Sequence, residues 1–216
     1  MPSDIVLPRG NEKQLIDMAL RLSYSRLYLG YTLKDWKARG TEQIRKIKNG
    51  SKTSNTCLDV QPAIITSSLN EIKKGRSTGS PIIFSLKRPE RISPAMRNTL
   101  VLGFELSPRH DFIFQRNAGV DEPSCRIAAE NNICFGFSFQ DILKAREPAV
   151  IMGRMAQNIN LYRKHKLGCV FASLAQEPYD LRSPADLASL LVCLGMQPNK
   201  AKECLEQGLE WQNPRL

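Results

Sequence analysis

Few side chains in this 216-residue sequence are of the types that carry out acid, base or metal chemistry. The two histidines, His110 and His165, do not follow clear strands, and His165 lies in the basic run RKHK, which is typical of an exposed helix end. Metal-dependent hydrolases need clusters of His, Asp and Glu that converge on one ion. The acidic pair Glu177 and Asp180 falls in a predicted loop, where a structural role is expected. No phosphate-binding glycine loop or nucleophile-elbow motif occurs. The sequence therefore predicts neither a catalytic residue nor a metal site.

Six cysteines are spread along the chain without any CxxC pair. Most lie inside apolar stretches such as ICFGF and GCVFA, where a thiol behaves as a small buried side chain. Zinc sites need closely spaced ligands, so this spacing predicts reduced structural thiols rather than metal ligands or disulfides. The cysteines are Cys57, Cys125, Cys134, Cys169, Cys193 and Cys204.

Polar and basic side chains follow most of the predicted strands. In a parallel barrel these positions lie on the carboxyl face, where ligands bind. Because none of them is a catalytic group, we expect contacts to a phosphate backbone, for which the planar fork of arginine is well suited. The residues predicted to make these contacts are Lys34, Lys87, Arg88, Arg91, Arg116, Asn117, Gln176 and Arg182.

The charge of the chain is unevenly distributed. Residues 1–110 contain 19 Lys and Arg against 9 Asp and Glu, whereas residues 111–216 contain 12 of each, so the first half carries the whole net charge of +10. A solubilising surface is one explanation. A polyanionic partner explains the asymmetry better, because clustered basic side chains release counterions from a phosphate backbone.

The elements that must position these residues alternate along the chain. Short apolar runs separated by amphipathic stretches predict parallel strands joined by right-handed crossover helices. The predicted strands are 3–7, 26–29, one within 58–66, 81–86, 111–115, 133–139 and 169–174, and the predicted helices are 11–23, 33–48, 122–131, 148–165, 184–195 and 199–207.

About seven such units in one chain fit a single-domain α/β barrel of TIM type over residues 1–216, with 184–216 as closing helices. A doubly wound open sheet is the alternative, and the pattern does not decide whether the barrel closes. Residues 99–106 (TLVLGFEL) fit either a strand or the later turns of a helix opened by Pro94. No apolar run approaches the length of a membrane span, and the N-terminus lacks the segments of a secretory signal, so a cytoplasmic protein is expected.

Three segments in the second half resemble protein component 3 of archaeal ribonuclease P, a family related to the eukaryotic 30-kDa subunit. They are AGVDEPSCRIAAENNICFGFSF (118–139), NLYRKHKLGCVFASLAQEPYDLRSP (160–184) and ADLASLLVCLGMQPNKAKECL (185–205). In the first half only the β/α rhythm is similar.

The resemblance implies a barrel related to the PHP phosphoesterase fold that lacks its metal ligands. It also implies a non-catalytic subunit of an endonuclease whose RNA cleaves precursor tRNA, with a component 2 protein subunit as partner and no cofactor beyond the Mg²⁺ that the RNA requires. Gln176 in AQE and Arg182 in DLRSP match the family motif. The family register favours a helix for residues 99–106 and the strand at 111–115, and it leaves the polar loop 50–55 unplaced.

Two other functions remain open at this point. A stand-alone metal-dependent barrel phosphoesterase would need metal ligands that the sequence does not offer. An adaptor that mainly docks protein would need an exposed apolar surface, expected on the last two helices. For Arg182 itself the alternative to RNA binding is an ion pair with Asp180 that fixes the loop.

Overall fold

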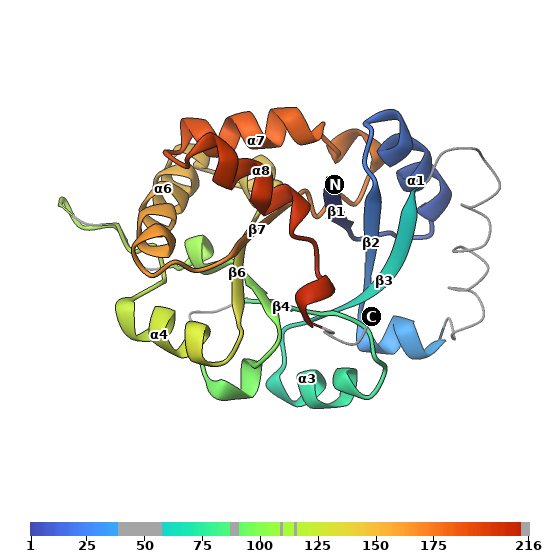
Figure 1. Cartoon of the computed structure of the whole chain (residues 1–216), viewed down its shortest axis with the longest axis horizontal. Helices are drawn as coiled ribbons and strands as arrows, with labels where there is room; N and C mark the ends of the chain where they lie inside the picture. The colour runs from blue at the N-terminus through green and yellow to red at the C-terminus, as the bar shows by residue number, and fades with distance from the viewer. Residues whose placement is uncertain (39–57, 87–90, 109, 115, 213–216) are drawn as a thin grey trace.

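Seven parallel strands follow one another around a barrel in the order of the sequence (Figure 1). The computed structural model describes residues 1–38, 58–86, 91–108, 110–114 and 116–212. Each strand pairs in parallel with the next. The strands are β1 (Ser3–Val6), β2 (Arg26–Tyr31), β3 (Asp59–Thr66), β4 (Ile82–Ser85), β5 (Leu100–Leu102), β6 (Cys134–Ser138) and β7 (Cys169–Ala172).

The ring is completed where the chain leaves β7 and meets β1. Val6 forms a parallel bridge with Ala175. The Leu7 amide donates to the carbonyl of Ala175 (2.8 Å), and the Leu174 amide donates to that of Ile5 (2.9 Å). Sequential strand order with this closure identifies a TIM-like barrel and excludes the doubly wound sheet.

Helices cover the outside of the barrel. Two of them begin where the sequence places a proline in the first turn behind a capping side chain, as at Ser183, which accepts a hydrogen bond from the Asp186 amide (3.2 Å). The helices are α1 (Glu12–Arg21), α3 (Leu69–Arg76), α4 (Glu122–Glu130), α5 (Phe139–Lys144), α6 (Pro148–Lys164), α7 (Pro184–Cys193) and α8 (Pro198–Glu206), and the short 3₁₀ turns are η1 (Pro94–Met96), η2 (Phe104–Leu106), η3 (Pro178–Asp180) and η4 (Glu210–Gln212). None of the described helices is long and apolar enough to cross a membrane.

Alternate residues of each strand face the two sides of the barrel wall. Inside, an apolar cluster includes Ile5, Tyr28, Ala63, Ile83 and Val170. Outside, a second cluster between strands and helices includes aromatic side chains such as Phe135 and Phe137, which contact Tyr162 of α6. The barrel interior is therefore packed core rather than a channel.

The C-terminal segment closes the amino end of the barrel. Leu209 is buried in the interior cluster, and its amide donates to the Tyr28 hydroxyl (3.0 Å). The Gln212 side chain accepts from the Ile82 amide (2.6 Å) and donates to the Ile82 carbonyl (3.0 Å). Ligands are thereby directed to the opposite, carboxyl face or to the outer surface.

One strand was predicted at the wrong place. The fifth strand is Leu100–Leu102, followed by Gly103 with a positive φ of 93° and then by η2, so residues 99–106 are not a helix. Residues 111–114 are not a strand and lie outside the barrel. The reason is packing: Leu100, Val101 and Leu102 are all buried and pair with both neighbouring strands, which local composition cannot reveal.

The other predicted strands are confirmed, whereas α3 and α5 were not predicted. Residues 33–38 are helical as expected, and the rest of the predicted helix 33–48 lies outside the described residues, as does the loop 50–55. The assignment of residues 1–216 to a single domain stays a prediction.

Candidate nucleic-acid interface

The predicted RNA-binding residues separate into two groups in the structure. Lys34, Arg91, Gln176 and Arg182 follow strands of the barrel, as expected, and Lys34 and Arg91 are exposed. Lys87 and Arg88 lie outside the described residues. The carboxyl face therefore holds part of the predicted set.

Gln176, in the loop that follows β7, is held by two neighbours. Its side-chain oxygen accepts from the ammonium of Lys144 on α5 (2.9 Å), and its carbonyl accepts from the Asn11 side chain (2.9 Å). Lys144 was missed in the sequence because α5 itself was not predicted. These bonds connect the loop after β7 to α5 and to the start of α1. The side-chain oxygen and the backbone carbonyl of Gln176 therefore both accept hydrogen bonds from within the chain.

Arg182 is also partly structural, although in a different way from the predicted ion pair. Its Nη1 donates to the carbonyls of Tyr179 (2.6 Å) and Leu181 (2.8 Å), and the guanidinium lies over the Phe139 ring at 5.5 Å. Within the described chain no ion pair joins it to Asp180. This guanidinium is half-buried, and no hydrogen bond within the described residues uses its other N–H groups, which is the kind of donor set that binds a phosphate.

Arg116 and Asn117 do not lie at a strand end, which corrects their predicted placement. They follow the segment 111–114 and pack against α6. The Gln157 side chain accepts a hydrogen bond from the Arg116 backbone amide (3.1 Å) and donates one to the Arg116 backbone carbonyl (2.9 Å). Gly153 leaves room for the Arg116 guanidinium, which a Cβ there would approach to 2.5 Å. The Asn117 backbone amide donates to the Asp111 carboxylate (2.8 Å), and its side-chain amide donates to the His110 carbonyl.

A buried arginine organises this part of the chain. Arg154 of α6 is 6% exposed, and its Nε donates to Asp111 (2.9 Å) while its Nη1 donates to the carbonyls of Glu105 (2.9 Å) and Ser107 (2.7 Å). Although desolvation opposes it, the bond from Asn117 and the charges of Arg154 and Arg116 lower the pKa of Asp111 below its ordinary value. The segment is thus fixed to α6 by one ionised carboxylate.

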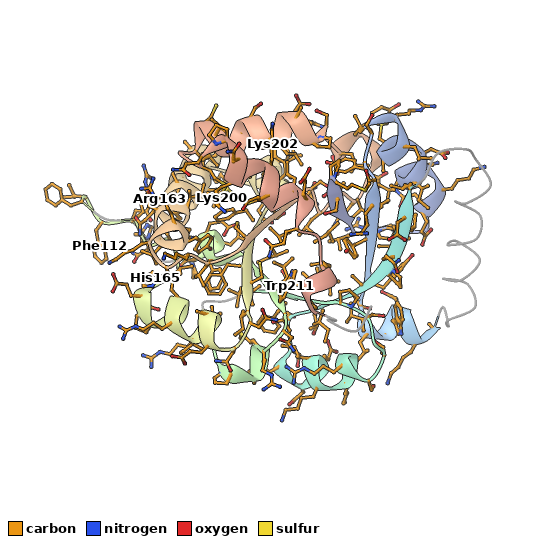
Figure 2. All side chains as sticks on the ribbon, in the orientation of Figure 1. Phe112, Arg163, His165, Lys200, Lys202 and Trp211 are labelled. Atoms are coloured by element: carbon orange, nitrogen blue, oxygen red, sulfur yellow. The ribbon has the colours of Figure 1, made fainter. Side chains whose placement is uncertain are left out.

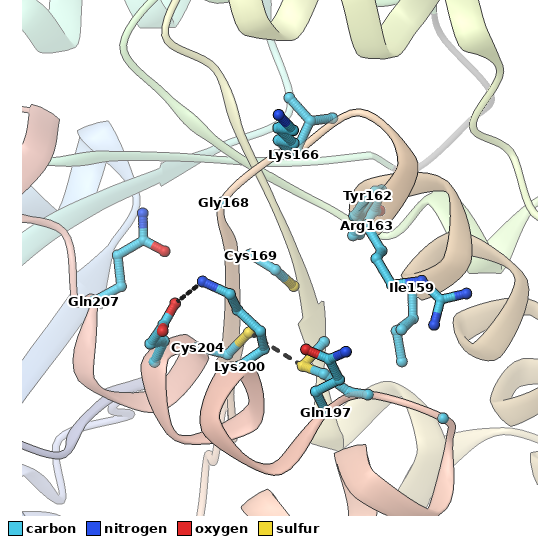
Figure 3. Close-up of a pocket in the computed structure, with 14 residues that line it drawn as sticks. Ile159, Tyr162, Arg163, Lys166, Gly168, Cys169, Gln197, Lys200, Cys204 and Gln207 are labelled. Atoms are coloured by element: carbon cyan, nitrogen blue, oxygen red, sulfur yellow. Dashed lines mark hydrogen bonds and ion pairs between the residues drawn. The ribbon is translucent and has the colours of Figure 1, made fainter.

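A cavity of about 400 Å³ opens on the outer surface between α6, the start of β7 and α8 (Figure 3). Its floor includes Cys169, Met196 and Cys204. Basic side chains stand at its edge: Arg163 and Lys200 (Figures 2 and 3) and Lys166 (Figure 3). Lys200 is paired with Glu203 (2.5 Å), and Arg163 donates to Asn160 (3.0 Å). Cys169 is the first residue of β7, so this cavity lies toward the opposite end of the barrel from the predicted face.

The basic edge of the cavity suits an anionic group such as a phosphate. Two of its three cations, Arg163 and Lys166, come from the RKHK run, which was interpreted from the sequence as an ordinary exposed helix end, and the third, Lys200, comes from α8. The basic run was visible in the sequence. The apolar cavity beside it was not, because α8, which lines the cavity, lies far from the run in the sequence. His165 in this run is half-buried and caps α6, whereas His110 is exposed.

Burial raises the pKa of several acids and thiols. Burial raises the pKa of Glu105 to about 8, and neither of its carboxyl oxygens has a hydrogen-bond partner among the described residues. Burial also raises the pKa of Asp141 to about 6 and that of Cys125 to about 11. Across the described ranges no three His, Cys, Asp or Glu side chains converge on a point where a metal ion would bind. Of the cysteines described, four are buried and Cys193 is exposed.

A family model described as RNase P subunit p30 matches residues 106–210. The matched residues include Arg116 and Asn117 beside α6, the residues that line the cavity, and the helices α7 and α8. The resemblance to ribonuclease P protein component 3 is confirmed.

Curated relatives of the ribonuclease P family align with the same half of the chain. Ribonuclease P protein component 3 of Methanosarcina acetivorans is 29% identical over 105 residues, which cover 46% of this chain and 44% of the relative. The protein of the same description from Methanothermobacter thermautotrophicus is 32% identical over 95 residues, covering 42% and 38%. The matched segment thus spans less than half the length of each relative.

Solved structures extend the likeness to nearly the whole fold. A chain in the cryo-EM structure of archaeal ribonuclease P with mature tRNA superposes with a TM-score of 0.72 at 16% identity, covering 96% of this chain and 89% of that one. Aspergillus niger ochratoxinase gives 0.55 at 10% identity over 98% and 70%, and an amidohydrolase gives 0.52 at 10% over 95% and 72%. At these identities the likeness shows the barrel fold, including in the half of the chain outside the family match.

Proposed function

We propose that this protein is a non-catalytic, RNA-binding subunit of a ribonuclease P ribonucleoprotein, in which the RNA matures the 5′ end of precursor tRNA. The observation that carries the proposal is the match of residues 106–210 to the RNase P subunit p30 family. The likeness of the whole barrel to a chain of archaeal ribonuclease P supports it.

The proposed partners are the ribonuclease P RNA, a component 2 protein subunit and, within the complex, precursor tRNA. Basic side chains neutralise crowded phosphates that would otherwise require Mg²⁺, so the protein lowers the magnesium that the RNA needs. No cofactor of its own is proposed, and a cytoplasmic location stays a prediction. No observation among the described residues supports the alternative of a stand-alone metal-dependent phosphoesterase.

The proposed RNA surface has two parts. Lys34, Arg91, Gln176 and Arg182 on the carboxyl face remain the predicted contacts, with Lys87 and Arg88 predicted from the sequence alone. The edge of the α6–α8 cavity adds Arg163 and Lys166, and this region lies within the segment that matches the family.

The test is cleavage of precursor tRNA by the cognate RNA at limiting magnesium, with and without this protein and a component 2 subunit. We expect stimulation that requires the RNA and is largest with both proteins, and no cleavage by the proteins alone. Absence of stimulation at every magnesium concentration, with the protein folded, would overturn the proposed function.

A further inference from the structure

Positive charge gathers in the part of the chain that runs from the end of α3 to the end of β5. Residues 72–104 contain seven Lys and Arg against a single acidic residue, Glu90. Four of these cations lie at the C-terminal ends of α3 and η1, and all four side chains are exposed. They are Lys73, Lys74, Arg76 and Arg97, here called the α3–η1 surface.

The fold brings these cations together on the outside of the barrel, where α3 lies (Figure 1). The Arg76 guanidinium donates through Nη2 to the backbone carbonyls of Ala95 (3.1 Å) and Arg97 (2.8 Å). These two bonds fix the last turn of α3 against the end of η1. Arg97 is therefore a neighbour of the α3 cations in space, although about 20 residues of chain separate it from them.

The charge of this surface is not balanced by acidic side chains. Across the residues that the structure describes, no salt bridge involves any of the four cations. The one acidic residue of α3 is Glu71, and its carboxylate accepts from the Thr66 hydroxyl (2.5 Å) at the other end of the helix. Arg26 on β2, by contrast, is paired with Asp59 (3.0 Å).

Stabilisation of the helix accounts for only a small part of this charge. Cations in the last turn of a helix offset its dipole, whose negative end carries only about half an elementary charge. The last turn of α3 alone carries three full charges, and Arg97 adds a fourth. A cluster with such an excess attracts a polyanion, because it releases counterions from a phosphate backbone.

We propose that the α3–η1 surface binds the phosphate backbone of the ribonuclease P RNA, separately from the carboxyl face and the α6–α8 cavity edge. The inference rests on the proposed function, which supplies the RNA. Within residues 69–86 and 91–104 the aromatic side chains, Phe84 and Phe104, are both buried, so no ring is presented on which a base could stack. Binding here therefore depends on charge and not on base sequence.

The experiment removes one cation from each of the two elements, with the double substitution Lys73→Gln and Arg97→Gln. The matched control is Lys13→Gln with Arg21→Gln, two exposed cations of α1, a helix that carries as many acidic as basic residues. A charge-conserving variant, Lys73→Arg with Arg97→Lys, separates charge from side-chain shape. Affinity for the ribonuclease P RNA is measured by filter binding over a series of salt concentrations, and folding by thermal unfolding.

We expect the first variant to bind the RNA about 10- to 30-fold more weakly near physiological salt, with the slope of log affinity against log salt reduced by about 1–2. The control and the charge-conserving variant should bind like the wild type, and all three should unfold cooperatively. Wild-type affinity in the first variant would overturn the inference and leave the proposed function standing. An equal loss in the control, or in the charge-conserving variant, would overturn it as well. A wild-type protein that does not bind the RNA would overturn both proposals.

Discussion

The carboxyl face of the barrel and the loop of residues 110–114 use their side chains in opposite ways. At the carboxyl face the polar groups of Gln176 and Arg182 bond largely to their own chain, through Lys144 and two backbone carbonyls. On the loop the polar residues fix the base, and the apolar tip is left without a partner among the described residues. The difference shows that a polar residue after a strand can serve mainly to hydrogen-bond its own chain. Its position after a strand therefore does not by itself identify a ligand contact.

The largest effect on this comparison is expected from a substitution at Arg154, which holds the base of the loop. Arg154→Ala leaves Asp111 and two carbonyls without their buried donor, so we expect the free energy of unfolding to fall by about 3–5 kcal/mol. Urea denaturation measures this loss. The control is Arg116→Ala, which removes the more exposed and longer contact to Asp111 and should cost under about 1 kcal/mol. Equal losses in the two variants would mean that the loop base is not organised by the buried arginine.

Glu105 offers a second test, because it is a buried carboxyl group beside the loop base. Its two carboxyl oxygens have no hydrogen-bond partner among the described residues. Its pKa is raised by burial from an ordinary 4.5 to about 8, so the folded state keeps a proton that the unfolded state releases. Its contribution to stability is therefore complete below about pH 4.5 and is lost as pH rises toward 8.

Glu105→Gln removes this titration. We expect the stability of the variant relative to the wild type to increase by about 2–4 kcal/mol between pH 5 and pH 8. Denaturation at both pH values gives the two differences, and the other buried acids cancel because both proteins contain them. A relative stability that does not change with pH would show that Glu105 is ionised in the folded protein.

The smallest expected effect compares the two proposed RNA surfaces. Arg163→Ala with Lys166→Ala should weaken RNA binding about 10-fold and reduce the slope of log affinity against log salt by about 1–2. Arg182→Ala should lower stability by about 1 kcal/mol, because two hydrogen bonds and a cation–π contact are lost. Salt titrations of RNA binding and thermal unfolding separate the two roles. If Arg182→Ala alone lowers the salt slope, the carboxyl face rather than the α6–α8 cavity edge binds the RNA.

The sequence by itself determined the alternation of strands and helices and the scarcity of catalytic groups, whereas barrel closure was decided by the structure. Alternation of apolar runs and amphipathic stretches is a local property, and it predicted six of the seven strands and the long helix α6. The histidine and cysteine spacing likewise argued against a metal site before any fold was known. Family motifs in residues 118–205 then indicated the ribonuclease P resemblance that the family match confirms.

Only the tertiary structure decided which of two apolar segments became the fifth strand. Leu100–Leu102 and residues 111–114 are both β-prone, but only the first can pair with β4 and β6 while burying every side chain. The same long-range packing placed Lys144 against Gln176 and Arg154 beneath Asp111, and brought α8 beside α6 to form the cavity. Each of these features joins residues far apart in the chain, and local sequence carries no record of such distances.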